Sequence, residues 1–480
     1  MAARTTGTAA FGAWSAASCS VRSSWPAEED DMSQITRRAF IKGSTLCLTA
    51  LGGMRLGLHA RRAHADWQTG NFFVYVYLRG GIDGLNMVCP IDGPDRAHYE
   101  MHRPNIHLRT TGATAALPLG NTHYGLNFAA TGLHELYGQG RLAIVHGTGF
   151  PVAQITRSHF DAQDYMEHGT PGSNTIGTGW LARHLQATGQ VPDSAMIPSL
   201  SVAANAPTSL LGRRDNMVLD DPNSFHPNAN NGNVDGQPRY KLSTTMTLRQ
   251  LYQGNDDLHH AGTGAVDTIE LVDTLGISSY TPAPGANYPS TGVAATLGNQ
   301  AKLIANIAKR GLGLQVATLD YGGWDSHENQ GDGTQGDLNQ NQYANRLAGL
   351  SATLHALYTD LAAAGLHNRM VLVVHSEFGR RVRENANRGT DHGSGNPMLV
   401  LGGRVRGGQL FGTFGGLGPG QLYQNEDVAS TTDFRRVLSE VVAGHLGNPD
   451  LASVFPGYDY PGPLGLLPGD PLFANGFDPA

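Results

Sequence analysis

Four continuous apolar runs constrain the fold of this chain more than any other feature of its sequence. Each run is rich in β-branched, leucine or aromatic residues and lacks polar alternation, a pattern typical of strands covered on both faces. The runs are residues 72–78, 142–146, 314–319 and 370–375. Helical periodicity at 297–310 and 343–364 directly precedes the last two runs, so we expect helices there. Strands that alternate with helices predict a mostly parallel α/β sheet.

The segment 188–294 differs from the rest because clusters of proline, asparagine and glycine interrupt it. We interpret it as an inserted, loop-rich cap region with one helix near 242–253. Residues 432–446 carry the pattern of a final helix. We therefore expect one large domain over residues 66–480 that contains this insertion.

The first 65 residues carry the signature of an export signal. Arg37 and Arg38 form a twin arginine, residues 44–58 are mostly apolar, and residues 63–65 offer an A-x-A cleavage point. A short membrane anchor is the alternative reading, but about 15 apolar residues are too few to span a bilayer comfortably. We expect export in the folded state by the twin-arginine machinery, cleavage before Asp66, and a periplasmic or extracellular location with no membrane span after cleavage.

The charge of the expected mature chain argues against a nucleic-acid partner. Residues 1–65 carry eight basic and four acidic side chains, so their removal moves the formal charge from −7 to −11, and an acidic chain repels nucleic acid. Only Cys89 remains after cleavage, so an intramolecular disulfide is excluded. Whether translation begins at Met1 or Met32 is left open, because Met32 makes the more ordinary signal-peptide start.

Carboxylates and histidines follow the predicted strands, where ligands bind in open parallel sheets. The candidate metal ligands are Asp83, Asp325, His327, Glu377, Asp391 and His392. Each residue alone is more simply read as a turn residue, a cap or one partner of an ion pair. If they converge, they would repel one another without a cation, so we predict one or two divalent ions, with zinc, manganese and calcium all suited to these ligands.

Residues 157–163 follow the second apolar run and are predicted to begin a helix. Ser158 is interpreted first as the N-cap of that helix, and alternatively as a nucleophile at a helix N-terminus. Arg157 and Arg380 are candidates for binding an anionic substrate group. The motifs of ordinary serine hydrolases, P-loop proteins and zincins are absent from the sequence.

Five motifs of this chain, taken together with the leader, resemble a known family. They are L-R-G-G-I-D-G-L-N at 78–86, R-S-H-F-D-A-Q at 157–163, G-W-D-S-H-E-N-Q at 323–330, S-E-F-G-R at 376–380 and G-T-D-H-G at 389–393. In order and spacing the chain resembles a bacterial family of unknown function whose members are exported, sulfatase-like proteins of the alkaline phosphatase superfamily.

The resemblance implies a three-layer α/β/α sandwich and a two-metal centre for phosphoryl or sulfuryl transfer. It makes Asp83 the first-strand metal aspartate, Asp325 and His327 a pair for the other metal, and His392 the last metal histidine. Glu377 takes the place of the usual aspartate, while Phe378 stands where the superfamily has a histidine, which puts the second metal in doubt.

Two functions from different classes follow from these observations. The first is an exported metal-dependent hydrolase of small phosphate or sulfate esters, with Ser158 or a water molecule as the attacking group. The second is a non-catalytic exported binding or assembly protein that keeps the fold, which the replacement at Phe378 favours.

Overall fold

The computed structural model describes residues 70–188, 195–213, 216–220, 238–274 and 279–468. The predicted export signal lies outside the described residues. Within them, no helix combines the length and the apolar character that crossing a membrane requires.

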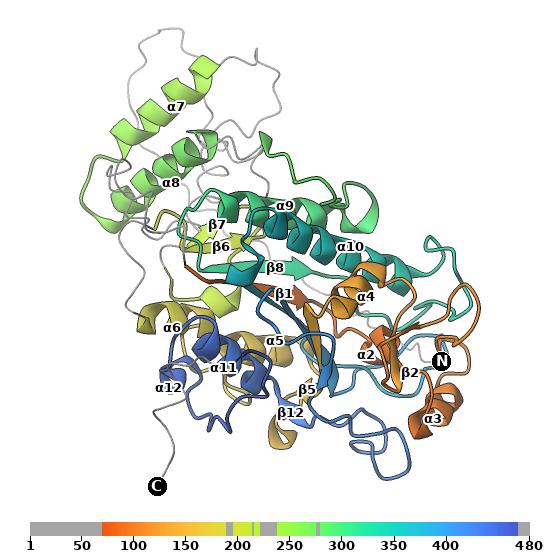
Figure 1. The fold of residues 1–480 in the computed structure, drawn as a ribbon. Helices are drawn as coiled ribbons and strands as arrows, with labels where there is room; N and C mark the ends of the chain where they lie inside the picture. Colours follow the sequence, from red (N-terminus) through yellow and green to blue (C-terminus); the bar gives the residue numbers. More distant parts are fainter. Residues whose placement is uncertain (1–69, 189–194, 214–215, 221–237, 275–278, 469–480) are drawn as a thin grey trace, which may run out of the picture.

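A nine-stranded sheet forms the centre of the molecule (Figure 1). Its strand order is β11-β5-β10-β9-β1-β8-β6-β7, and β12 pairs with the C-terminal end of β5. The strands are β1 Phe72–Leu78, β5 Leu142–Gly149, β6 Ser199–Val202, β7 Asn216–Val218, β8 Val316–Tyr321, β9 Met370–His375, β10 Asn396–Gly402, β11 Leu410–Phe411 and β12 Thr432–Asp433. Every paired neighbour is parallel except β10, which runs antiparallel to both β5 and β9.

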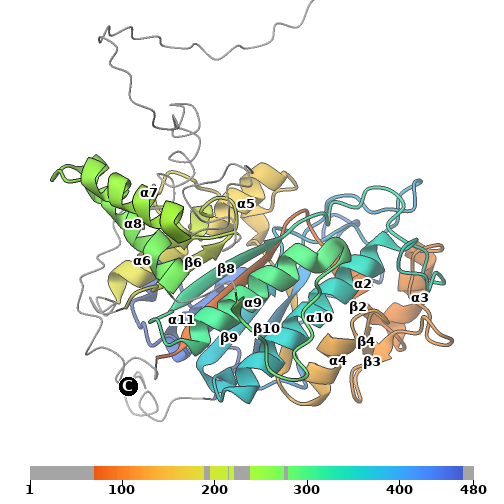
Figure 2. The same cartoon turned by 90° about the horizontal axis from the view of Figure 1, so that it is seen from above.

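Two helical layers cover the two faces of this sheet, one above it and one below it in Figure 1, and Figure 2 looks down on the upper layer. One layer contains α4 Thr131–Gly138, α9 Ala295–Lys309 and α10 Gln342–Ala363, and the other contains α5 His159–His168, α6 Trp180–Ala187, α11 Phe434–Gly444 and α12 Leu451–Val454. The fold is therefore a three-layer α/β/α sandwich with a mostly parallel sheet, which confirms the predicted fold class.

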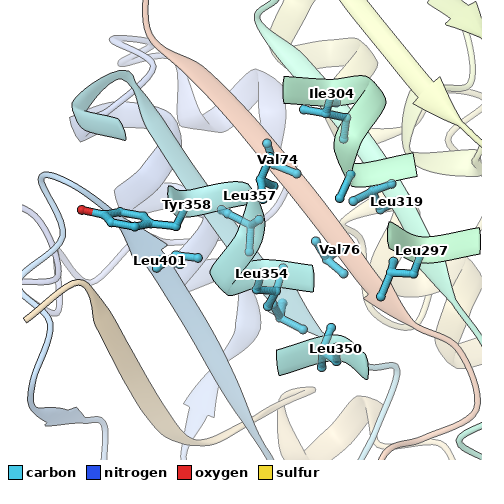
Figure 3. Packing of buried hydrophobic residues seen from close by; sticks show 14 of the residues in the cluster. Val74, Val76, Leu297, Ile304, Leu319, Leu350, Leu354, Leu357, Tyr358 and Leu401 are labelled. Atoms are coloured by element: carbon cyan, nitrogen blue, oxygen red, sulfur yellow. The ribbon is translucent and has the colours of Figure 1, made fainter. Parts of the chain in front are cut away.

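The sequence of β1 shows why both faces of the sheet are covered. All seven residues of this strand are buried, and successive side chains point to opposite faces. Val74 and Val76 pack with leucines of α9 and α10 (Figure 3). On the other face Phe73 and Tyr75 pack against Trp180 of α6, with ring centroids 5.9 and 5.4 Å from the indole.

The remaining elements lie around this sandwich. A small sheet of order β2-β4-β3 has strands Val88–Pro90, Tyr124–Leu126 and Leu117–Pro118. Beside it lie α2 Gly84–Met87 and α3 Pro94–His102, while α7 Pro238–Leu251 and α8 Asp257–Thr274 form a helical pair that projects from the body (Figure 1). Short 3-10 helices are η2 Val152–Gln154, η3 Thr208–Leu210, η5 Gly292–Ala294 and η6 His367–Arg369.

The segment 188–294, expected as an inserted cap, also contributes to the central sheet. Its strand β6 pairs with β8, and β7 pairs with β6. The helix expected near 242–253 is α7. The final helix α11 begins at Phe434, two residues later than expected, because Asp433 caps it.

Candidate functional site

The candidate site lies where β9, β1 and β8 end side by side. The chain leaves β1 through Gly80 and Gly81, whose φ angles of 116° and 62° favour glycine. A Cβ on Gly80 would lie 2.6 Å from the backbone nitrogen of Asp325. This close approach brings the segment after β8 against the exit from β1, and the backbone amide of Gly80 donates to Glu377 after β9 at 2.9 Å.

Three histidines around this edge are each fixed by the Nδ1 atom of the ring. His159 donates from Nδ1 to Oε1 of Glu377 at 2.7 Å, and His327 donates to Oδ1 of Asp391 at 3.1 Å. His392 donates to the carbonyl oxygen of Arg157 at 2.8 Å. Because an ionised carboxylate and a carbonyl can only accept, each Nδ1 carries the proton. In the neutral ring, Nε2 then holds a lone pair.

The three Nε2 atoms converge on one carboxylate oxygen, Oδ1 of Asp325. The distances to this oxygen are 2.9 Å from His327, 3.2 Å from His392 and 3.4 Å from His159. The Nε2 atoms of His327 and His392 also lie 2.9 Å from each other. Neutral imidazoles would here direct lone pairs at one another and at an anion, so the arrangement calls for a cation or for protonation of the rings.

A divalent metal fits this donor set. His159, Asp325 and His392 form a group in the described part of the chain whose candidate ligand atoms all lie within 4.8 Å of one another. The Nε2 atom of His159 is buried and, besides its 3.4 Å approach to Asp325, has no hydrogen-bond partner among the described residues, which leaves it able to bind a ligand. Three imidazoles and one carboxylate are ligands that suit zinc and other transition metals.

Two predicted ligands stand behind the histidines instead of beside the centre. Glu377 is fully buried and accepts from His159, from Gln163 at 3.0 Å and from Gly80. Asp391 contacts the outer edge of His327 and accepts from Asn385 at 3.1 Å. Carboxylates in this position orient the imidazole and strengthen it as a ligand.

The charges of the site alter the protonation of its members. Burial would raise the pKa of Glu377, but hydrogen bonds from His159 and Gln163 lower it to about 2. Burial likewise opposes ionisation of Asp325, whose pKa the Arg380 guanidinium lowers to about 2. The hydrogen bond to Glu377 raises the pKa of His159. A proton and a metal therefore compete for Nε2 of His159, so we expect metal affinity to fall as the pH falls.

Asp83 is bound apart from this group. Its carboxylate forms an ion pair with Arg103 at 2.6 Å, with both side chains fully buried, and it also accepts from the amide of Gln330 at 2.5 Å. Asp83 thus already has a cationic partner, which suggests a structural role for a residue predicted to bind metal.

The three predicted catalytic residues also have internal partners. Arg157 forms an ion pair with Asp427 at 2.6 Å. Arg380 is fully buried, donates to the carbonyl of Thr390 at 2.8 Å and contacts Asp325 at 2.6 Å. Ser158 is the N-cap of α5, where its hydroxyl accepts from the backbone nitrogen of Asp161 at 3.4 Å. The helix geometry therefore agrees with the interpretation of Ser158 as an N-cap, while its nucleophilic role stays a prediction.

Phe378 occupies the space beside two of the histidines. Its ring is 1% exposed, and its centroid lies 4.8 Å from that of His159 and 5.0 Å from that of His392. An aromatic ring offers no metal ligand, so Phe378 cannot help to hold a second metal. The described residues here form one candidate metal centre.

A polar pocket of about 370 Å³ opens beside the centre. Asp325 and His327 belong to its wall, so it adjoins the convergent nitrogen atoms. Gln342, Tyr343 and Arg346, from the N-terminal part of α10, also line it. The pocket is large enough for a small ligand in contact with the centre.

His159 is the functional residue that sequence reasoning missed. It is the first residue of α5 and follows the N-cap Ser158. The predicted helix start accounted for the sequence pattern here, so His159 was assigned no role as a ligand. The available signal was its position in R-S-H-F-D-A-Q, directly after Arg157 and Ser158, which were both already candidates.

The comparisons with known proteins bear on family membership and not on activity. The chain belongs to the family described as "Protein of unknown function (DUF1501)", whose model matches residues 152–449. A search of curated proteins found no match.

Among solved structures, Ps i-CgsB aligns at 11% identity with a TM-score of 0.36, over 81% of this chain and 74% of that one. The PsFucS1 sulfatase from Pseudoalteromonas sp. aligns at 10% identity, TM-score 0.31, over 77% and 68%. The lipoteichoic acid synthase LtaP from Listeria monocytogenes aligns at 8% identity, TM-score 0.24, over 76% and 71%. Because the TM-scores are this low, these likenesses carry no information about the activity of this chain.

Proposed function

We propose that the protein is an exported, metal-dependent hydrolase of phosphate or sulfate esters. The observation that carries the proposal is the convergence of three imidazole Nε2 atoms on Oδ1 of Asp325 beside a polar pocket. His159, His327, His392 and Asp325 would hold the metal. A bound divalent cation would stabilise the charge that develops on the ester oxygens during hydrolysis.

The side chains around the centre would orient the metal ligands and keep them in the protonation state that binds a metal. Glu377 and Asp391 hold the Nδ1 protons of His159 and His327, which keeps their Nε2 atoms turned inward. Arg380 contacts Asp325 and favours its ionised form. Ser158 or a water molecule in the pocket would attack the ester, and export along the twin-arginine route would deliver the domain 66–480 to the periplasm or beyond.

The alternative proposal is a non-catalytic exported protein with the same fold. Phe378 favours it, because this ring stands where the resembled superfamily supplies a histidine to a two-metal centre. In that case the four convergent ligands would hold a single structural ion.

Metal content and ester turnover, measured on the same purified protein, test the two proposals. We expect one tightly bound divalent ion and turnover of 4-nitrophenyl phosphate or 4-nitrophenyl sulfate. His392→Ala should lose both, whereas His123→Ala should lose neither, because the His123 side chain is 69% exposed.

Four outcomes separate the hypotheses. Ser158→Ala with full metal content but no turnover would support a nucleophilic serine, and retained turnover would support attack by water. A metal-loaded wild type without turnover over a broad ester panel would favour the binding protein. Absence of a bound metal would contradict both forms of the metal proposal.

A further inference from the structure

We infer that the pocket beside the metal centre binds substrate and that Arg346 recognises an oxyanion of that substrate. The inference rests on the proposed function and adds the residue and the chemical class of ligand. Arg346 was not among the arginines that the sequence singled out. It lies in the first two turns of α10 and lines the same pocket as Asp325 and His327.

Among the described residues that line the pocket, Arg346 is the arginine, and its guanidinium is available to bind an anion. Arg157 is paired with Asp427, and Arg380 is paired with Asp325. No ion pair joins Arg346 to a carboxylate among the residues that the structure describes; its Nη1 donates to the carbonyl oxygen of Gly322 at 3.3 Å. A guanidinium offers five donors in a planar fork that matches phosphate, sulfate and carboxylate.

The backbone before the metal ligand Asp325 holds this guanidinium in place. Gly323 has a φ of 87°, and a Cβ on Gly323 would lie 2.4 Å from Cζ of Arg346. The guanidinium therefore packs directly on a glycine of the segment that carries Asp325. Such packing preorganises the fork and lowers the entropy lost on binding an anion.

The rest of the pocket suits an ester with a polar body. Amide side chains of Asn329, Gln342 and Asn387 line it, and an amide both donates and accepts hydrogen bonds. Glu328 also lines the pocket and carries the opposite charge to Arg346. The ligand class is therefore a phosphate or sulfate ester of a hydroxyl-bearing molecule, with Glu328 weakening and Arg346 strengthening the hold on the anion.

Calorimetric titration with inorganic phosphate and inorganic sulfate tests the inference without turnover. We expect Arg346→Gln to weaken binding of the preferred anion by about 10- to 100-fold, since a hydrogen-bonded charge is lost. Arg346→Lys should give an intermediate loss, because it keeps the charge but not the fork. Glu328→Gln should tighten binding, and Arg404→Gln, which removes an exposed charge outside the pocket, should leave it unchanged.

A pair of glycine variants separates positioning from charge. Gly323→Ala keeps Arg346 but displaces its guanidinium, so we expect a loss similar to that of Arg346→Gln. Gly365→Ala is the matched control: its φ of 71° imposes comparable backbone strain, and no atom of the described residues lies within 4 Å of the added Cβ. It should bind phosphate and sulfate as the wild type does.

The outcomes distinguish this inference from the proposed function. Wild-type affinity in Arg346→Gln, or no binding of either anion by the metal-loaded wild type, would overturn the role of Arg346. Turnover with an unchanged KM in Arg346→Gln would do the same while leaving the hydrolase intact. Binding that depends on Arg346 without turnover of any ester would uphold the pocket and reject the hydrolase.

Discussion

Replacing Asp83 with asparagine is expected to lower stability and to leave metal binding unchanged. The carboxylate of Asp83 and the guanidinium of Arg103 lie 2.6 Å apart and are both fully buried. Removal of one member of such a pair leaves a buried charge without its counter-ion, at a cost of about 3–5 kcal/mol. Three other acceptors hold Arg103, namely the carbonyls of Val382 and Arg381 and the side chain of Asn86, so we expect a value near 3 kcal/mol.

This loss of free energy converts to a measurable change in melting temperature. A folded region of roughly 400 residues has an unfolding entropy of about 0.8 kcal/mol per kelvin, so about 3 kcal/mol lowers Tm by about 4 °C. Differential scanning calorimetry measures the shift, and competition with a chelator measures the metal affinity. Asp92→Asn is the control, because the Asp92 side chain is 63% exposed and its loss should change stability by less than about 0.5 kcal/mol.

The opposite result would refute the structural role of Asp83. If Asp83→Asn kept the wild-type Tm and lost its metal, then Asp83 would be a ligand, as the resemblance to the superfamily implies. A fall in both quantities would require a metal-free comparison of the two proteins. A Tm difference that vanishes without metal would also assign Asp83 to the metal centre.

Three further predictions address the centre, the pH response and export. Glu377→Gln should weaken metal binding by about 10- to 100-fold, because His159 loses the carboxylate that orients it; chelator competition measures this. Asp360 is fully buried and pairs with the ammonium of Lys309, so Asp360→Asn should cost about 3 kcal/mol at neutral pH. Burial raises the pKa of Asp360, but the Lys309 ammonium and other hydrogen bonds lower it overall. The stabilising contribution of Asp360 is therefore present above its unfolded pKa near about 4 and is lost as the pH falls through the lower folded value. The difference in Tm between wild type and Asp360→Asn should therefore shrink in acid. Replacement of Arg37 and Arg38 with lysine should leave precursor in the cytoplasm, as fractionation would detect.

Each of these predictions has a control or an opposing outcome. Glu328→Gln removes the same kind of charge near the centre without an assigned contact to a histidine, so equal metal loss in both variants would argue against orientation by Glu377. A stability gap for Asp360→Asn that widens in acid would reverse the assigned sign of the pKa shift. Normal export of the double lysine variant would rule out the twin-arginine interpretation.

The sequence alone determined the strands whose side chains are buried on both faces. The predicted runs 72–78 and 370–375 are β1 and β9 without a shift, because each is apolar or aromatic up to its last residue and is bounded by polar residues. Strand β10 was missed. Its sequence begins Asn396-Pro397, and a proline usually argues against a central strand. Only the tertiary structure inserts it antiparallel between β9 and β5.

The sequence likewise predicted one part of the candidate site, and only the tertiary structure decided the other part. The rule that ligands bind at the carboxyl ends of parallel strands brought Asp325, His327 and Glu377 to one edge of the sheet from sequence alone. The partner of Glu377 is His159, which lies 218 residues away in the chain, and the position of a strand contains no information about that contact. Docking of α5 against the sheet decides it, because local sequence sets the element in which a side chain sits, whereas long-range packing sets what that side chain meets.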